Sequence, residues 1–325
     1  MTPPDPLLAT GGSGGGSPAP DRSGARGTVL ARTRAELDAA LAALPATAGT
    51  GGRGTTHARA VVMTMGALHA GHLSLVARAR ELADAVVVTI FVNPLQFGPS
   101  EDLERYPRDL DSDLALLAGA GADVVFAPTL DVVFPDGDPV VRVSAGQLGA
   151  VLEGRTRPGH LDGVLTIVLK LAHLVRPDVA IFGQKDAQQV MAVQAMVRDL
   201  DVPMTVVAAP TVRDVDGLAL SSRNAYLSAR DRETALVLSR ALRAAEDVAR
   251  APGTDADDVR AAARAQLAGA DLDLDYLALV DPRTAQEVPA AHRGPAVLAV
   301  AATVGATRLI DNVPLRLGER AGSLG

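Results

Sequence analysis

The chain has 325 residues, which is enough for one large domain or two of ordinary size. It contains no Cys, so disulfides, thiolate metal sites and Cys nucleophiles are excluded, and the composition fits a reducing, cytoplasmic environment. The net charge of −7 disfavours a general nucleic-acid binder, and no apolar run is long enough to span a membrane, so we expect neither as a partner.

The first segment of the chain, residues 1–27, is rich in Gly, Ser, Pro and Ala, which predicts a disordered head. Thr33–Leu44 follows with a helical spacing of Leu and Ala. Thr33 with Glu36 three residues later predicts a capping box at the start of that helix. Ala46–His57 is again rich in Gly and Thr and is expected to be a loop.

Short β-branched runs then alternate with helical patterns. The five expected strands are Ala60–Met63, Ala85–Val92, Asp123–Ala127, Asp178–Phe182 and Thr205–Ala208. The expected helices between them are Leu73–Ala83, Asp109–Ala118, Val164–Val175 and Ala187–Leu200. This alternation predicts an α/β fold with a Rossmann-like parallel sheet, helices on both faces and right-handed crossovers.

The last third of the chain has a different pattern. Two helices are expected at Ser228–Arg250 and Thr254–Ala268, followed by three strands at Leu274–Val280, Ala296–Ala302 and Thr307–Val313. We interpret this as a smaller α+β C-terminal domain, hinged near Thr211. Residues 28–211 then form the Rossmann-like domain, and residues 212–325 form the second domain.

His69-Ala70-Gly71-His72 follows the first strand and opens a helix. A helix start offers free N–H groups and the positive end of the dipole, which suits phosphate, and Gly71 is expected to let a ligand approach the backbone. Imidazoles there can donate hydrogen bonds to a pentavalent α-phosphate, which indicates nucleotidyl transfer. The alternative is that a four-residue string arises by chance and these are ordinary surface or core histidines.

Three more polar clusters follow strands: Asn93-Pro94-Leu95-Gln96, Gly183-Gln184-Lys185-Asp186 with Gln189, and Ser221-Ser222-Arg223-Asn224. Ligands bind at the carboxyl edge of the strands in open α/β sheets, so four clusters at one edge are hard to explain by chance. Lys185 would neutralise a triphosphate, Asp186 would bond a ribose hydroxyl, and the Ser-Ser-Arg segment suits β- and γ-phosphates.

Each of these clusters also has an ordinary structural explanation. Asn93 before Pro favours a turn, Asp186 fits a capping carboxylate, and the Ser-Ser-Arg segment fits a polar loop or a helix cap. Asp113 either faces a triphosphate and holds Mg²⁺ or belongs to a solvated acidic helix face. His160 is placed on a loop before a long helix, where it either binds substrate or caps that helix.

Five sequence blocks in order make the chain recognisable. They are Thr64-Met65-Gly66-Ala67-Leu68-His69-Ala70-Gly71-His72, Ile90-Phe91-Val92-Asn93-Pro94-Leu95-Gln96-Phe97, Tyr106-Pro107-Arg108, Phe182-Gly183-Gln184-Lys185-Asp186 and Asp216-Gly217-Leu218-Ala219-Leu220-Ser221-Ser222-Arg223-Asn224. With them the chain resembles the pantothenate synthetase (pantoate–β-alanine ligase) family of the H-x-G-H nucleotidyltransferase superfamily, from about Val61 to Val313.

The resemblance implies an AMP-forming ligase of two steps. Pantoate attacks the α-phosphate of ATP to give pantoyl adenylate and pyrophosphate, and β-alanine then displaces AMP to give pantothenate. It implies ATP as co-substrate, Mg²⁺, a cytoplasmic homodimer and a C-terminal domain that acts as a lid. The path of the β-alanine proton is not visible in the sequence.

The resemblance also implies roles for individual residues. The residues implied to contact the phosphates are His69, His72, Lys185, Ser221, Ser222 and Arg223, and those implied to make other ATP contacts are Met65, Gly71, Gly183, Asp186, Val212 and Leu220. Pantoate is implied to bind Gln96 and Gln189, in a pocket lined by Asn93, Tyr106 and His160. Asp113 is implied to hold Mg²⁺.

Three apolar positions depart from the family pattern, namely Met63, Leu161 and Leu220, and we expect adjusted packing there rather than lost chemistry. Two other functions stay open at this point. One is a nucleotidyltransferase acting on a small phosphate-bearing acceptor, against which the amides of Gln96 and Gln189 argue because they suit a small hydroxy acid. The other is a non-catalytic nucleotide-binding protein, against which the intact polar motifs argue.

Overall fold

The computed structural model describes residues 27–44, 57–98, 103–104 and 106–318. The expected disordered head, apart from Gly27, and the expected loop Ala46–His57, apart from its last residue, lie outside the described residues. None of the helices within the described part of the chain is both long enough and apolar enough to cross a membrane.

The larger sheet has six parallel strands in the order β1-β4-β3-β2-β5-β6. Their bounds are β1 (Val29–Ala31), β2 (His57–Thr64), β3 (Ala83–Ile90), β4 (Val124–Phe126), β5 (Val179–Gly183) and β6 (Thr205–Ala209). All five expected strands are confirmed. The sequence analysis missed β1, because a strand of three residues is too short to show a pattern, and it forms only by pairing with β4.

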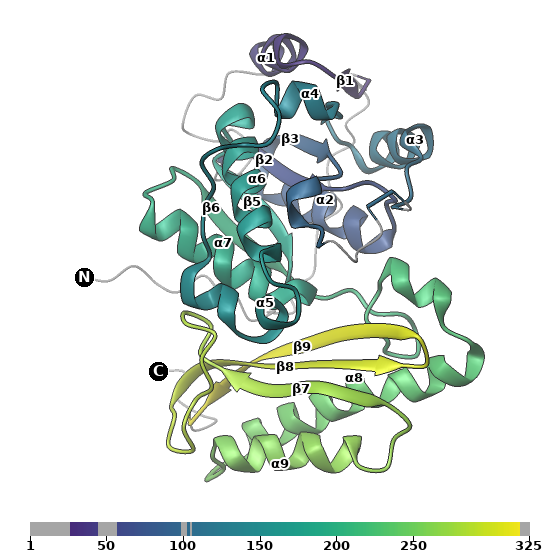
Figure 1. Cartoon of the computed structure of the whole chain (residues 1–325), viewed down its shortest axis with the longest axis vertical. Helices are drawn as coiled ribbons and strands as arrows, with labels where there is room; N and C mark the ends of the chain where they lie inside the picture. The colour runs from purple at the N-terminus through teal and green to yellow at the C-terminus, as the bar shows by residue number, and fades with distance from the viewer. Residues whose placement is uncertain (1–26, 45–56, 99–102, 105, 319–325) are drawn as a thin grey trace, which may run out of the picture.

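Helices cover both faces of this sheet (Figure 1). The elements are α1 (Arg34–Ala43), α2 (Ala70–Leu82), η1 (Pro94–Gln96), α3 (Leu110–Ala120), α4 (Leu130–Val133), η2 (Gly146–Ala150), α5 (Leu152–Thr156), α6 (His160–Val175), η3 (Gln184–Asp186) and α7 (Ala187–Asp199). Alternate residues of the strands face opposite layers: Val61 packs with α1, α6 and α7, whereas Val62 packs with α2 and α3. Both layers are apolar, because a parallel sheet is buried on both faces.

Two local expectations are tested here. The capping box at Thr33 is confirmed, since its hydroxyl accepts from the Glu36 N–H and the Glu36 carboxylate accepts from the Thr33 N–H. The placement of His160 on a loop is wrong, because His160 is the first residue of α6. The left-handed conformation of Gly159 lets the helix begin four residues before the expected Val164.

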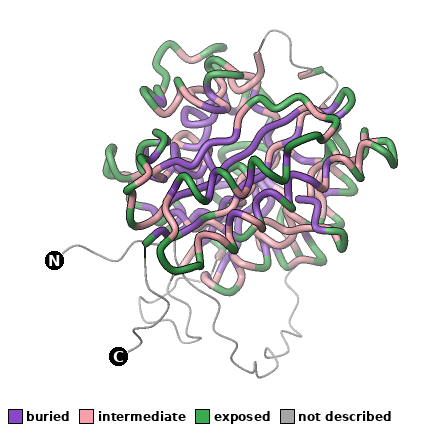
Figure 2. The backbone as a smooth tube through the Cα atoms, turned by 90° about the horizontal axis from the view of Figure 1, so that it is seen from below, coloured by how far each residue is buried: buried purple, intermediate pink, exposed green. Residues whose placement is uncertain are grey.

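The C-terminal part folds around its own core, below the parallel sheet in Figure 1. It comprises η4 (Ser222–Tyr226), α8 (Ala229–Arg250), α9 (Ala256–Leu267), β7 (Asp273–Val280), β8 (Gly294–Val304) and β9 (Thr307–Leu317). The strands form an antiparallel sheet in the order β7-β8-β9, and α8 and α9 pack against it. The expected α+β architecture is confirmed, and Figure 2 shows buried backbone running through the interior of the molecule.

Candidate nucleotide-binding site

A buried carboxylate, that of Asp113, holds the turn that follows β2. Gly66 and Ala67 both have positive φ, at +87° and +52°, so the chain bends sharply before His69. The Asp113 carboxylate accepts hydrogen bonds from the N–H groups of Ala67 at 3.0 Å and Leu68 at 2.8 Å. A Cβ on Gly66 would come within 2.9 Å of the same carboxylate. Asp113 therefore braces the turn that delivers the two histidines.

The two histidines lie on the first turn of α2 and complete its capping. His69 is the N-cap residue, and its Nδ1 accepts from the Gly71 N–H at 3.1 Å. His72 Nδ1 accepts from the His69 N–H at 3.3 Å, and the two ring centroids are 4.2 Å apart. A neutral imidazole that accepts through Nδ1 carries its proton on Nε2. Each ring therefore has one N–H left to donate to a ligand.

Both imidazoles are neutral at physiological pH. The pKa of His72 is lowered to about 4, mainly by burial and then by the nearby His69 and Lys185, against an opposing effect of Asp186. Burial also lowers the pKa of His69, again with a contribution from Lys185. The pair can stabilise negative charge by donating hydrogen bonds without binding a ground-state phosphate as a fixed cation would.

The expected role of Gly71 needs a correction. A Cβ at this position would meet the His69 ring at 2.8 Å, so the absent side chain makes room for that imidazole. Gly71 lines the cleft as expected, but the space beside its Cα belongs to His69 rather than to an approaching base or phosphate. A side chain at this position would therefore displace the His69 imidazole.

A second wall of the site is built where η1 packs against α6. Asn93 is buried, and its amide donates to the Gly163 carbonyl at 3.1 Å and to Gln96 Oε1 at 3.3 Å. Its Oδ1 accepts from the Leu95 N–H, so the turn-forming role is confirmed. His160 Nδ1 lies 2.8 Å from the Gln96 carbonyl oxygen and must donate to it, because a carbonyl only accepts.

That bond determines the neighbouring contact. With the proton on Nδ1, His160 Nε2 accepts from Arg157 Nη1 at 3.0 Å. Arg157 also reaches the Gln96 carbonyl, at 3.5 Å. This wall therefore places the Arg157 guanidinium beside the His160 ring and the Gln96 backbone carbonyl. The sequence analysis assigned Arg157 no role.

The third wall is the start of α7, which follows β5 through η3. Lys185 and Asp186 lie on this turn, with Lys185 Nζ 3.8 Å from Asp186 Oδ2. The capping explanation for Asp186 is wrong, because its side chain makes no cap hydrogen bond although it occupies the N-cap position. Its carboxylate is half exposed and lies at the cleft, beside a lysine that the helix dipole alone would disfavour there.

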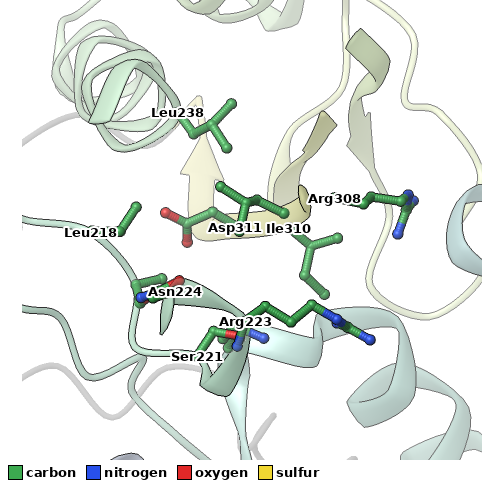
Figure 3. Close-up of a pocket in the computed structure, with 11 residues that line it drawn as sticks. Leu218, Ser221, Arg223, Asn224, Leu238, Arg308, Ile310 and Asp311 are labelled. Carbon is green, nitrogen blue, oxygen red and sulfur yellow. The ribbon is translucent and has the colours of Figure 1, made fainter. Parts of the chain in front are cut away.

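The fourth wall comes from the C-terminal part (Figure 3). Ser221 caps η4 by accepting from the Arg223 N–H, so the helix-cap explanation is confirmed for Ser221. Ser222 and Arg223 follow it and are exposed. Arg308 and Asp311 of β9 lie beside this segment. The segment therefore presents hydroxyl and guanidinium groups toward the other walls.

These four walls enclose one cleft of about 1160 Å³. Every site residue expected from the sequence lines it except Asp113, which lies beneath the turn. Asp113 is also not part of a solvated acidic face, because it is only 3% exposed. The cleft also has polar lining residues to which the sequence analysis gave no role, among them Glu153, Arg157, Tyr276, Arg308, Asp311 and Asn312.

No sequence signal marked most of these missed residues, because they have no local motif and meet the cleft only through packing between the two domains. Glu153 on α5 accepts from Tyr276 Oη at 2.9 Å and from both terminal nitrogens of Arg308, at 2.9 and 2.6 Å. Arg308 also pairs with Asp275. This cluster joins the first domain to the second across the mouth of the cleft.

The residues that the structure describes form no preorganised metal-binding site. No three carboxylate or imidazole side chains among them converge on a space that could hold a metal ion. Both oxygens of Asp113 already accept backbone hydrogen bonds. The side chains described do not fit a cation held by the protein alone.

A Rossmann-like sheet with an H-x-G-H helix start and cationic groups across the cleft defines a nucleotide-binding enzyme of the nucleotidyl-transfer class. Residues 32–314 match the family model described as pantoate-beta-alanine ligase. The chain belongs to the pantoate–β-alanine ligase family, whose reaction is the ATP-dependent condensation of pantoate with β-alanine.

Individual relatives agree with this assignment. The chain is 61% identical to the pantothenate synthetase of Thermobifida fusca over 268 residues, covering 79% of this chain and 90% of that protein. It is 54% identical to that of Salinispora arenicola over 292 residues, covering 89% and 98%. Among solved structures, the pantothenate synthetase of Thermus thermophilus superposes with a TM-score of 0.78 at 46% identity, covering 88% of this chain and 99% of that one.

A further solved structure is a pantoate-beta-alanine ligase from Francisella tularensis complexed with beta-gamma ATP and beta-alanine. It superposes with a TM-score of 0.67 at 31% identity and covers 88% of this chain and 97% of that one. Its ligands correspond to two of the three substrates of the ligase reaction, the nucleotide and the amino acid.

Proposed function

We propose that this chain makes pantothenate from pantoate, β-alanine and MgATP through a pantoyl-adenylate intermediate. The observation that carries the proposal is the pairing, in one cleft, of two neutral Nε2–H imidazoles with the cations of Lys185 and Arg223. The first group stabilises charge that appears only in the transition state, and the second binds charge that is present throughout.

In the first step a carboxylate oxygen of pantoate attacks the α-phosphorus of ATP, and the bond to the β-phosphate oxygen breaks. Lys185, Ser221, Ser222 and Arg223 hold the departing pyrophosphate, while His69 and His72 donate to the α-phosphate oxygens. No strong base is needed, because pantoate is already ionised at neutral pH. Catalysis then rests mainly on positioning and charge stabilisation.

In the second step the neutral amine of β-alanine attacks the acyl carbon of the adenylate. The acyl–oxygen bond breaks, AMP leaves, and the amine loses a proton. Gln96 and Gln189 hold the pantoyl hydroxyl groups, within the wall that Asn93, Tyr106 and His160 complete. The ribose of the nucleotide is met by Asp186 and the Gly183 backbone, with Met65, Gly71, Val212 and Leu220 beside it.

Mg²⁺ is proposed to enter on the phosphates of ATP, since magnesium commonly keeps several waters and takes few protein ligands. A direct ligand role for Asp113 stays a prediction, and its place under the turn favours bracing instead. A cytoplasmic homodimer is likewise proposed from the family resemblance. A hinge near Thr211, between residues 28–211 and 212–325, is proposed from the change of pattern along the sequence. Light scattering of the purified protein tests the dimer.

The reaction itself is tested by measuring AMP release from MgATP and pantoate, with and without β-alanine, together with the product mass. We expect AMP and pantothenate to form only when pantoate and β-alanine are both present. Lys185→Ala should remove most turnover while the circular dichroism spectrum stays native. Amine-independent adenylylation of another acceptor would instead indicate the nucleotidyltransferase alternative.

A further inference from the structure

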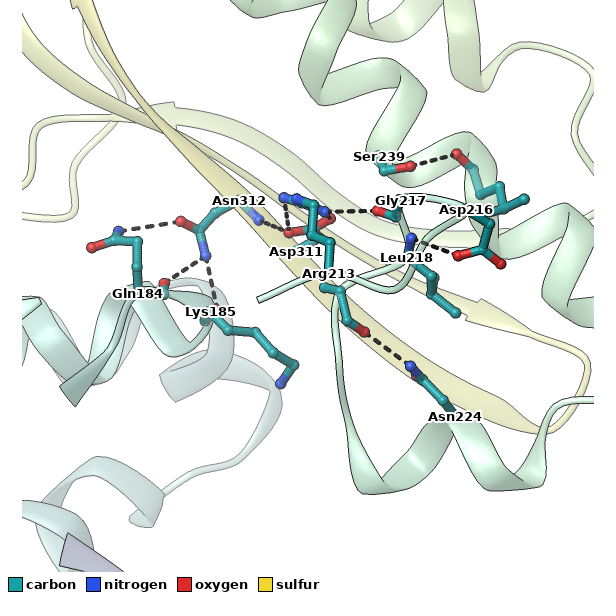
Figure 4. A network of polar contacts seen from close by, with 12 residues as sticks. Gln184, Lys185, Arg213, Asp216, Gly217, Leu218, Asn224, Ser239, Asp311 and Asn312 are labelled. Atoms are coloured by element: carbon teal, nitrogen blue, oxygen red, sulfur yellow. Dashed lines mark hydrogen bonds and ion pairs between the residues drawn. The ribbon is translucent and has the colours of Figure 1, made fainter. Parts of the chain in front are cut away.

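Two adjacent residues of β9, Asp311 and Asn312, connect the small domain to both segments that we propose to bind the triphosphate (Figure 4). They are 4% and 3% exposed, and the mechanism above gives neither a role. Burying an ion or an amide is costly unless its hydrogen bonds are made. Their partners therefore indicate what they do.

The side chain of Asn312 makes its hydrogen bonds to η3, in the other domain. Its Nδ2 donates to the carbonyl oxygens of Gln184 at 2.9 Å and Lys185 at 2.8 Å. Its Oδ1 accepts from Gln184 Nε2 at 3.2 Å. One amide side chain thus uses both of its donor hydrogens and its acceptor on two consecutive residues of the other domain.

These contacts act on the lysine that faces the phosphates. The Lys185 side chain starts from a backbone whose carbonyl groups are held from the opposite side by Asn312. Lys185 lies in a three-residue 3₁₀ turn that links β5 to α7, so the Asn312 contacts hold this link itself. The direction in which Lys185 leaves the turn therefore depends on the docking of β9.

Asp311 makes the matching connection to the other phosphate segment. It accepts from Arg213 Nη1 at 2.6 Å and Nη2 at 3.0 Å, and Arg213 Nη1 also donates to the Gly217 carbonyl at 3.2 Å. Arg213 bridges to Ala219 across this turn, two residues before Ser221. The Asp311 carboxylate also accepts from the Asn312 N–H at 2.8 Å, which joins the two connections.

We propose that Asn312 is a positioning residue for Lys185, and that Asp311 does the same for the Ser221–Arg223 segment through Arg213. The inference rests on the proposed function, because it assumes that these segments bind the triphosphate. In this arrangement the small domain does more than cover the site. The phosphate site is complete only when β9 lies against η3.

The test separates the two half-reactions in Asn312→Ala and Asn312→Leu. Pyrophosphate release from MgATP and pantoate reports the first step, and aminolysis of supplied pantoyl adenylate by β-alanine reports the second. We expect the KM for ATP to rise and the first step to slow about tenfold to a hundredfold, the effect of a misplaced catalytic group. The KM for pantoate should stay unchanged and the second step should change far less.

Val313→Ala is the matched control, since Val313 is the next residue of β9 and packs against the apolar core of the small domain. It should lower the melting temperature and leave the ratio of the two half-reactions unchanged. An unchanged first step in the Asn312 variants, or an equal loss in both steps, would overturn the inference.

Lys185→Ala, measured in parallel, separates this inference from the proposed function. If Lys185→Ala loses the first step and the Asn312 variants keep it, only the positioning role fails. If Lys185→Ala itself releases pyrophosphate at the wild-type rate, the proposed phosphate role of Lys185 fails and the inference falls with it.

Discussion

The two regions of the cleft that we propose to bind the phosphates are built in opposite ways. The His69–His72 corner belongs to one strand-to-helix turn, is partly buried and is neutral, with its conformation held by its own backbone and by Asp113. The segment Ser221–Arg223 is largely exposed and cationic, and the turn that precedes it is joined to β9 by the Arg213–Asp311 ion pair. The difference fits the two roles that we propose: the neutral histidines stabilise the transition state, and the cationic segment binds the negative charge of the substrate.

The largest effect is expected at the neutral corner. His72→Ala should lower kcat about 10²–10³-fold, the usual effect of removing one donor to a transition-state oxyanion. His72→Gln should recover part of this loss, because an amide also offers a neutral N–H. Steady-state kinetics provide the measurement, and His173→Ala is the control, since that imidazole is exposed and bonds its own helix at the Leu169 carbonyl. A wild-type kcat in His72→Ala would contradict the proposal that the histidines, unlike Ser221–Arg223, act mainly on the transition state.

The brace beneath the corner should matter for stability as well as rate. Asp113→Ala removes two charge-assisted hydrogen bonds and should lower the free energy of unfolding by about 3–5 kcal/mol. Urea titration measures it, and Asp111→Ala on the same helix is the control because that carboxylate is exposed. If Asp113 instead acts mainly as a Mg²⁺ ligand, the variant would keep its stability and need more Mg²⁺.

The neutrality of the corner predicts a dependence of stability on pH. The pKa of His72 is about 4 in the folded protein and near 6.5 when unfolded, so the unfolded state binds the extra proton first as the pH falls. Stability should therefore be lost between pH 6.5 and 4, by about 2–3 kcal/mol from this residue. His72→Gln should flatten that part of the curve of unfolding free energy against pH. Parallel curves for the two proteins would contradict a buried neutral imidazole.

The smallest effect is expected where charges are paired but exposed. Arg230 and Asp271 lie 3.0 Å apart with side chains 83% and 82% exposed. Arg230→Ala should change the free energy of unfolding by less than about 0.5 kcal/mol and leave kcat unchanged. A larger change in either quantity would mean that exposed cations of the small domain outside Ser221–Arg223 also contribute to stability or to catalysis.

Much of the fold was predictable because its signals are local. Buried β-branched runs and helical spacing reveal a two-sided parallel sheet, and the capping box at Thr33 needs only residues three apart. The H-x-G-H motif likewise encodes its own capping within four residues. The strand β1 escaped notice because its existence depends on pairing with β4, almost a hundred residues later.

By itself the sequence determined the fold class, the family and the motif residues that line the cleft, since short-range patterns and ordered motifs carry that information. Only the tertiary structure decided that Asp113 lies under the turn, that Gly71 makes room for His69, and that Asn312 holds the backbone of Lys185. Each of these depends on which group fills the space beside a residue. Close packing in the folded chain decides that neighbour, and residue spacing along the sequence does not.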